Sequence, residues 1–458
     1  MFCGKTESAI RWNGMHLTTR RIVFYSLVAV FFLGAAYALL TAFGLSVDLK
    51  EGLTRTGSIF VAGAPRDATL FLDGAPAEES RGIISGGTLV RNLLPGNYEV
   101  RFEREGRAPW RAELPVISGL VTRATDLFLW PLEASASPVV ADVELFSLSA
   151  GAPLVKNSSG TLMLGDRAIP GNEVVYATND SGLTLTRSGN TIYLTETARA
   201  RSVTNVTALF QSLKERELGL PGAVPIVNAR PHPFSQGKLI ITTKTSLYLL
   251  DLRRISLERL VTVSAIAASA FTGDEVFLAG ADGTLTAVDL VFKTTRTAPF
   301  TSSAVAALAI GAGGDMVIWK TPEGTLFSYD RVTGDTVSVA DNAGEFSVSP
   351  DGLRLAAVER NAVAIIALAP YTADAFVARG YRTPVWEGSS TPKKISWNPT
   401  LPRYLFFLAD NRLIVAEIGF YGERNSYALA ENVMDFALAG YTAYVLKTDG
   451  ALITLSLE

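Results

Sequence analysis

Acidic residues that recur at the ends of apolar segments are the first candidates for chemistry in this sequence. Asp251, Asp289 and Asp330 follow one another in steps of 38 and 41 residues. A glycosidase needs two carboxyl groups within about 5–10 Å of each other. Equivalent positions in successive repeats lie far apart in space, so we expect each of these aspartates to cap or stabilise its own turn.

Histidine and cysteine, which supply most metal ligands and many catalytic groups, are scarce. The chain has two histidines, His16 and His232, and one cysteine, Cys3. His232 stands alone in the Pro-flanked stretch 230–233, with no nucleophile motif beside it and no second histidine for a zinc site. We expect it to be an ordinary surface or turn residue, and a single cysteine excludes an internal disulfide.

Motifs for phosphate, calcium or acyl chemistry are missing from the sequence. We find no sialidase box, no GxSxG elbow, no Walker loop and no EF-hand loop. The glycine-rich stretch 311–315 opens no helix, so it is predicted to be a turn and not a phosphate-binding loop. The sequence therefore predicts no catalytic residue, no metal, no cofactor and no enzymatic activity.

Aromatic residues in the longer loops near the C-terminal third are the better candidates for function. Binding surfaces are often anchored by aromatic side chains carried on loops. The candidates for partner binding are Tyr371, Tyr381, Trp386, Phe420 and Tyr421. Each of them could instead pack within the fold, and the sequence leaves that alternative open.

Composition bounds the class of protein. The chain has 458 residues, 48% of them apolar, with a mean hydropathy of +0.25. This is enough apolar material for two or three packed domains. The net charge is −3 and the basic residues are scattered, without the Lys/Arg stripe that follows a phosphate backbone. Nucleic acid is therefore not expected as a partner.

An uncharged apolar run at 22–44 predicts a transmembrane helix. At 1.5 Å per residue it is long enough to cross a hydrocarbon core of about 30 Å. Lys5, Arg11, Arg20 and Arg21 precede the run, so the positive-inside bias places residues 1–21 in the cytoplasm and the bulk of the chain outside. The alternative is a signal peptide cleaved after Gly44, although its apolar core usually has only about 7–15 residues.

A small β domain is predicted at 57–132, after a linker at 45–56. The clearest strands are 58–61, 68–72, 98–103 and 124–129, with turns at Asp73-Gly74 and Pro95-Gly96. The runs GSIFVAGAPRDATLFLDGAPAEE and LLPGNYEVRFEREG resemble the PEGA domain. That resemblance implies a small extracytoplasmic β-sandwich that serves as a binding or spacer module and carries no catalytic residues.

A repeated unit of about 40 residues fills the chain from 139 to 458, after a second linker at 133–138. Each copy has an apolar strand, a tight turn such as Asp282-Gly283 or Asp449-Gly450, and another strand. A period of this length is typical of β-propeller blades. The segment FSVSPDG (346–352) followed by LRLA resembles the Ser-Pro-Asp-Gly step of WD40-like repeats such as those of TolB.

Counting third strands predicts seven blades, at 191–195, 246–250, 284–288, 325–329, 362–367, 412–416 and 451–457. The last blade lacks a fourth strand, and we expect 142–148 to supply it and close the ring. Six or eight blades stay possible because 141–170 could form a degenerate extra unit. A short amphipathic helix is expected within 208–217, and the first strand of each blade should be small and apolar.

The sequence thus predicts a mainly β protein: a single N-terminal transmembrane helix, a small PEGA-like sandwich and a propeller. The leading hypothesis is a non-enzymatic, membrane-tethered scaffold of a bacterial cell envelope that binds protein or glycan through propeller loops. One alternative is a propeller enzyme that acts on envelope polysaccharide. A third possibility, a subunit of an envelope-assembly machine, differs from the first only in its partner.

Overall fold

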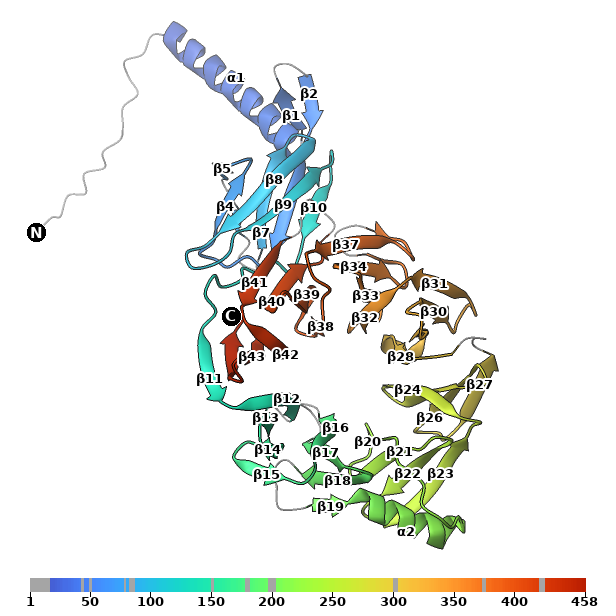
Figure 1. The fold of residues 1–458 in the computed structure, drawn as a ribbon. Helices are drawn as coiled ribbons and strands as arrows, with labels where there is room; N and C mark the ends of the chain where they lie inside the picture. The colour runs from blue at the N-terminus through green and yellow to red at the C-terminus, as the bar shows by residue number, and fades with distance from the viewer. Residues whose placement is uncertain are drawn as a thin grey trace, which may run out of the picture. The chain divides into compact units, whose positions relative to one another are not determined.

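The computed structural model describes residues 17–42, 45–48, 52–77, 80–81, 87–149, 152–177, 182–196, 203–299, 304–372, 376–419 and 425–458. These residues divide into two compact units. The first contains residues 1–101 and 113–127, and the second contains 102–112 and 128–458. We describe each unit by itself (Figure 1).

The N-terminal helix α1 runs from Leu17 to Ala42, so it begins five residues before the predicted span and includes Arg20 and Arg21. Its window Thr18–Ala35 has a mean hydropathy of 1.3, and none of that window is buried. The helix is long and apolar enough to cross a membrane, and a signal sequence would meet the same criteria.

The rest of the first unit is built from short strands. The predicted linker at 45–56 is not wholly irregular, because β1 (Leu45–Asp48) and β2 (Gly52–Arg55) pair as a hairpin. Two four-stranded sheets follow, in the orders β10-β3-β7-β6 and β5-β4-β8-β9. Their strands are β3 (Gly57–Ala62), β4 (Thr69–Leu72), β5 (Ala75–Pro76), β6 (Ser80–Arg81), β7 (Gly87–Leu93), β8 (Gly96–Glu103), β9 (Trp110–Val116) and β10 (Val121–Ala124).

The turn predicted at Asp73-Gly74 is found in these sheets, whereas one predicted strand lies at a different position. Asp73 and Gly74 both have positive φ (47° and 79°), as a two-residue hairpin between β4 and β5 requires. The strand expected at 124–129 instead lies at Val121–Ala124, parallel to β3. Leu127 and Leu129 are buried without belonging to a strand, which explains why their apolar pattern suggested one.

The second unit is a β-propeller made of eight four-stranded antiparallel sheets, which we number as blades 1 to 8 in chain order. Blades 1 to 4 are β12 (Val143–Ser149), β13 (Ala152–Asn157), β14 (Leu162–Leu164) and β15 (Arg167–Ile169); β16 (Glu173–Ala177), β17 (Leu183–Ser188), β18 (Thr191–Glu196) and β19 (Val203–Asn205); β20 (Asn228–Pro231), β21 (Lys238–Thr242), β22 (Ser246–Asp251) and β23 (Ser256–Thr262); and β24 (Ile266–Thr272), β25 (Glu275–Gly280), β26 (Thr284–Asp289) and β27 (Thr295–Pro299).

Blades 5 to 8 continue the same order. They are β28 (Ala307–Ile310), β29 (Met316–Lys320), β30 (Leu326–Asp330) and β31 (Thr336–Ala340); β32 (Ala343–Val348), β33 (Arg354–Glu359), β34 (Ala362–Ala367) and β37 (Arg382–Glu387); β38 (Lys394–Asn398), β39 (Leu401–Ala409), β40 (Arg412–Glu417) and β41 (Ser426–Ala430); and β42 (Val433–Ala439), β43 (Thr442–Lys447) and β44 (Leu452–Ser456) with β11 (Ala136–Val140).

The sheets close into a ring, because first strands contact one another at the other junctions, β12 contacts β42, and blades 3 and 4 share a core that includes Ile240 and Val276 (Figure 1). Blades 1 and 8 also share a core in which Val143 and Val155 pack with Leu446 and Leu452. A closed ring leaves no exposed sheet edge at the seam. The first strands line the centre of this ring.

The predicted count of seven blades is wrong by one. Each of the seven predicted third strands is found, and the additional blade lies within 141–170, which was the alternative that the sequence left open. Segment 142–148 does not close the ring, because β12 pairs with β13 and opens blade 1. The closing strand is β11, which pairs with β44 and begins inside the predicted linker at 133–138.

The one α-helix described in the second unit is α2, Val206–Leu218, inserted between blades 2 and 3 where the sequence predicts a helix at 208–217. Asn205 caps it, since its Oδ1 accepts the Ala208 N–H at 2.9 Å. Gly219 ends it in the left-handed conformation, with φ at 62°. Phe210 and Leu213 are fully buried in a core shared with blades 2 and 3.

Candidate functional site

The recurring aspartates cap the turns between third and fourth strands, which we call outer turns. Asp251 Oδ1 accepts the backbone N–H of Arg253 and of Arg254, both at 3.0 Å. Asp289 and Asp330 accept the equivalent pairs of amides in blades 4 and 5. The hydrogen bond from the Arg254 amide is the main cause of the lowered pKa of the Asp251 carboxyl. The predicted turn-stabilising role is confirmed.

The outer turns lie at the same end of each blade as the turns between first and second strands. In blade 3 the N–H of Leu252 donates to the Gly237 carbonyl at 2.8 Å. The same bond recurs from Leu290 to Asp274 and from Arg331 to Asp315. Since the first strands occupy equivalent places in the ring, the described outer turns face one side of the propeller.

Outer turns of consecutive blades expose apolar side chains on this side, and we call this set the rim row. Blade 3 contributes one residue, blade 4 two, blade 5 one and blade 6 two. The residues and their exposed fractions are Ile255 (51%), Val291 (53%), Phe292 (77%), Val332 (77%), Phe376 (70%) and Tyr381 (53%). Isolated exposed apolar residues are normal, whereas large contiguous patches of them mark interaction sites.

Ion pairs join the outer turns from blade to blade. Lys293 in the outer turn of blade 4 pairs with Glu258 in blade 3. Arg331 in the outer turn of blade 5 pairs with Glu275 of blade 4 at 2.8 Å, with both side chains mostly buried. Arg379 of blade 6 donates to Asp330 of blade 5 at 3.3 Å. These contacts connect the outer turns of blades 4 to 6 with the preceding blade.

The sequence-predicted aromatic residues separate into three groups. Tyr381 is exposed and belongs to the rim row. Tyr371 is half-buried in β35 (Tyr371–Thr372), which pairs with β36 (Phe376–Val377) as an inserted hairpin of blade 6. Trp386 is half-buried and packs on Phe407 of blade 7, with ring centroids 5.2 Å apart. Phe420 and Tyr421 lie outside the described residues.

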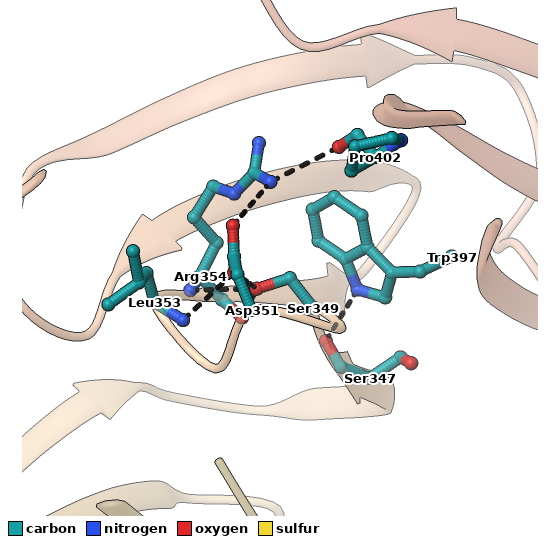
Figure 2. Close-up of polar contacts among 7 residues, drawn as sticks. All are labelled: Ser347, Ser349, Asp351, Leu353, Arg354, Trp397 and Pro402. Atoms are coloured by element: carbon teal, nitrogen blue, oxygen red, sulfur yellow. Dashed lines mark hydrogen bonds and ion pairs between the residues drawn. The ribbon is translucent and has the colours of Figure 1, made fainter. Parts of the chain in front are cut away.

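The Ser-Pro-Asp-Gly turn of blade 6 holds a buried arginine in a hydrogen-bonded network (Figure 2). Arg354 Nη2 donates to Asp351 Oδ2 at 2.8 Å and to the Pro402 carbonyl at 3.1 Å. Its guanidinium carbon lies 5.0 Å from the centroid of Trp397, whose Nε1 donates to the Ser347 carbonyl at 3.1 Å. The cluster therefore joins blades 6 and 7 and has a structural role.

Asp351 is the counter-ion in this network. Burial by itself raises the pKa of its carboxyl. Hydrogen bonds from Ser349 and the Leu353 amide, together with the positive charge of Arg354, outweigh burial and lower that pKa below its ordinary value. The carboxylate is therefore held in its charged form beside Arg354.

In blade 7 the position equivalent to the capping aspartates is Glu417. Its carboxylate is buried and accepts hydrogen bonds from neighbouring residues. The second unit includes residues 102–112, and Trp110 Nε1 from that segment donates to Glu417 Oε2 at 2.7 Å. Arg403 and Asn425 also donate to this carboxylate, at 2.8 and 2.7 Å. Burial beside it raises the pKa of the Tyr404 hydroxyl well above its ordinary range. This position is occupied and structural, unlike the open outer turns of blades 3 to 6.

A cavity of about 590 Å³ lies on the same side of the ring, where blades 2, 3 and 4 meet. Its polar wall comes from β20, β21 and the turn between them, and includes Arg230, His232 and Lys238. Phe271 and Leu290 of blade 4 and Tyr176 of blade 2 form much of its apolar wall. Its described lining residues include no aspartate or glutamate, so the carboxylate pair that glycoside hydrolysis requires is not found in this cavity.

His232 lies in a turn, as predicted, but it is a buried residue and not a surface one. Its Nδ1 accepts the N–H of Phe234 at 3.1 Å. Burial lowers the pKa of its imidazole, so the ring is neutral near pH 7. Within the described part of the chain, no group of three or more His, Cys, Asp or Glu side chains is placed to hold a metal ion.

Sequence reasoning missed the rim row apart from Tyr381, and it missed Arg230. One signal for Arg230 was available, since it stands in a first strand that was predicted to be small and apolar. Charge in first strands is not unique to blade 3, because Lys394 of blade 7 pairs with Asp435 of blade 8 at 2.7 Å. What sets Arg230 apart is the lack of such a partner among the described residues, which the sequence alone does not reveal.

Two comparisons with known proteins at the level of sequence give no match. No protein-family model matches the chain, and no curated protein sequence matches it. A chain in the crystal structure of a mitotic checkpoint complex is similar with a TM-score of 0.41 and 11% identity, over 71% of this chain and 92% of that one. The structure of Kluyveromyces lactis Hsv2p is similar with a TM-score of 0.40 and 12% identity, over 60% and 91%. The propeller assignment above rests on the strand order and contacts of this chain.

Proposed function

We propose that this protein is a non-catalytic, membrane-tethered scaffold that binds a partner protein through the rim row. The observation that carries the proposal is the exposure of Ile255, Phe292, Val332 and their neighbours at equivalent turns of four consecutive blades. Protein partners cover aliphatic and aromatic side chains of this kind at the centres of their interfaces. The aliphatic members favour a protein over a glycan as the partner.

The backbone at Ile255 supports a role in binding. Ile255 has φ at 52°, a conformation that is an outlier for a β-branched residue and costs about 1–2 kcal/mol. The equivalent residue of blade 5, four positions after the capping aspartate, is Gly334 with φ at 79°. Folding alone favours glycine at such a site, and Ile255 gains little burial in exchange. Strain without a packing benefit is typical of functional surfaces.

The tether in this proposal is α1, whose length and apolar surface suit a membrane span. The charges that precede it would keep the N-terminus in the cytoplasm and place the propeller outside. The PEGA-like sandwich would then act as a spacer between the bilayer and the ring, on the outer side of a bacterial envelope. These elements explain why the partner would be sought at the cell surface or in the envelope.

Site-specific crosslinking tests the binding surface. A photoreactive phenylalanine analogue is placed at Phe292 in the full chain expressed in its native membrane, and a matched analogue is placed at exposed Ser338 on the outer strand of blade 5. We expect one discrete protein adduct from position 292 and none from 338. The double variant Phe292→Ser and Val332→Ser, with the analogue moved to 376, should abolish the adduct. Equal adducts from both positions, or adducts with glycan or lipid only, would overturn the proposal.

Labelling with a membrane-impermeant maleimide tests the tether. In the variant Ser338→Cys the chain has two cysteines, Cys3 and the new one. In intact cells we expect labelling at 338 and none at Cys3 until the membrane is permeabilised. Loss of the N-terminal fragment from the mature protein would instead identify 22–44 as a cleaved signal peptide, and labelling of Cys3 in intact cells would reverse the orientation.

A further inference from the structure

The cavity of blades 2, 3 and 4 has basic side chains in its wall. Two cationic side chains, Arg230 and Lys238, belong to its wall, and none of its described lining residues is acidic. The neutral His232 adds a polar ring, while Phe271 and Leu290 provide apolar surface. Cavities of about 300–1,000 Å³ with apolar walls and a few convergent polar groups are typical of small-molecule sites.

Arg230 is the unusual member of this wall. Its guanidinium carbon lies 4.5 Å from the centroid of Phe271 and 5.8 Å from that of Tyr176, so two aromatic rings hold it in place. Its Nε is buried, and no described side chain or carbonyl accepts a hydrogen bond from it. Burial also lowers the pKa of this guanidinium, although not far enough to remove its charge near pH 7.

Lys238 has a carboxylate partner at long range. Its Nζ forms an ion pair with Asp251 Oδ2 at 3.8 Å, which is longer than a hydrogen bond. The other oxygen of Asp251 is already engaged in capping the outer turn of blade 3. Among the described lining residues, Arg230 is therefore the cation without a carboxylate partner.

Aromatic contacts account for only part of the cost of burying a guanidinium. A cation–π contact contributes about 0.5–2 kcal/mol, and a buried polar group without a partner costs a comparable or larger amount. Elsewhere in the ring a buried guanidinium is paired with a carboxylate, since Arg354 donates a hydrogen bond to Asp351. The partner that Arg230 lacks in the described chain is an anion that a ligand can bring.

We propose that this cavity binds a small ligand that carries a carboxylate or phosphate group next to an apolar body, with the Arg230 guanidinium as the principal contact of the anion. The planar donors of arginine fit either oxyanion. Phe271, Leu290 and the exposed Phe234 would cover the apolar body. The proposal concerns a site distinct from the rim row and does not depend on the scaffold function.

Three fluorinated probes with one shared body test the proposal: 4-fluorophenylacetate, 4-fluorophenyl phosphate and the neutral 4-fluorophenylacetamide. Binding to the full chain in lipid nanodiscs is followed by fluorine NMR, with empty nanodiscs as the blank. We expect saturable binding of at least one acid at millimolar concentration and much weaker binding of the amide. The acid that binds more tightly identifies the oxyanion that the site prefers.

Two arginine variants separate the site from general charge effects. Arg230→Met should weaken binding of the preferred acid by about 10- to 100-fold, the range expected for loss of a charge-assisted hydrogen bond. Arg259→Met removes an exposed arginine from β23 of the same blade and should leave binding unchanged. Should Arg230→Met fail to fold, Phe234→Ala at the exposed edge of the cavity serves instead and should weaken binding several-fold.

The proposal fails under any of three results. Binding of the amide as tight as that of the acids would show that charge is not recognised. Equal affinity of wild type and folded Arg230→Met would show that Arg230 is not the contact. Absence of saturable binding of both acids at millimolar concentration would show that the cavity is not such a site.

Discussion

Arg354 and Arg230 lie in the same ring, and their charges are compensated differently. The charge of Arg354 is paired with a carboxylate, whereas Arg230 has no such partner among the described residues. In blade 6, Arg354 meets Asp351, the Pro402 carbonyl and the face of Trp397 (Figure 2). In blade 3, Arg230 meets the faces of Phe271 and Tyr176, and no acceptor is found among the described residues. Both have an Nε that is buried without a partner, so the difference lies in the terminal nitrogens and the counter-ion.

The difference separates a structural arginine from a binding one. A buried charge that is paired and hydrogen-bonded becomes costly when one partner is removed, because the other is left unsatisfied. A buried charge without a partner has no such penalty, and its removal can even favour folding. The effects of substitution on stability should therefore differ sharply between the two sites, while their effects on ligand binding should be reversed.

The largest effect is expected for Arg354→Met. This change leaves the Pro402 carbonyl and Asp351 Oδ2 without the hydrogen bonds that Arg354 donates and removes a cation–π contact. We expect the free energy of unfolding to fall by about 2–3 kcal/mol. Urea unfolding of the full chain in nanodiscs, followed by tryptophan fluorescence, measures it. A loss no greater than that of Arg230→Met under the same conditions would break the comparison.

A smaller loss is expected for Trp397→Phe. Phenylalanine preserves most of the packing but has no donor for the Ser347 carbonyl and is a weaker cation–π partner for Arg354. The expected decrease is about 1 kcal/mol. Trp386→Phe is the matched control, since Trp386 also packs against blade 7 but contacts Phe407 and not an arginine. Equal losses in both variants would mean that packing alone accounts for the effect.

Acid should weaken the blade 6 network in a way that depends on Asp351. A carboxyl with a lower pKa in the folded chain stabilises it above the unfolded pKa of about 3.9 and loses that contribution as the pH falls through the folded value. Solvent screens this partly exposed group, so we expect less than about 1 kcal/mol. Unfolding measured between about pH 5 and pH 3 should be less pH-dependent for Asp351→Asn than for wild type. An identical pH dependence would remove Asp351 from the comparison.

The smallest effect on stability is expected for Arg230→Met without ligand. The change removes an uncompensated charge and two aromatic contacts, and these opposing terms leave the free energy of unfolding within about 1 kcal/mol of wild type. The same urea titration measures it, with Arg259→Met as the control for loss of one positive charge. A loss of free energy of unfolding as large as that of Arg354→Met would mean that Arg230 has a structural partner, and it would contradict the comparison.

Strand order in the ring was largely accessible from the sequence, because each blade repeats the same alternation of apolar strands and turn residues. The seven predicted third strands are found, and so is the capping role of Asp251, Asp289 and Asp330. Blade 1 was not included in the predicted number of blades because β14 and β15 have three residues each. Strands this short do not produce a clear alternation of apolar and polar residues. The closing strand β11 was not predicted because it pairs with β44, which lies at the other end of the propeller in the sequence.

Local chemistry thus determined what the sequence could reveal by itself: an apolar helix, turn residues with the required backbone freedom, and a repeat that predicts a propeller. The tertiary structure alone decided which charges are neutralised and which apolar side chains remain exposed. Asp351 and Arg354 are three residues apart, so their pairing is local, whereas the surroundings of Arg230 come from Tyr176 and Phe271 in two other blades. Burial and pairing across blades depend on how the sheets close into a ring, and that information is spread over the whole chain.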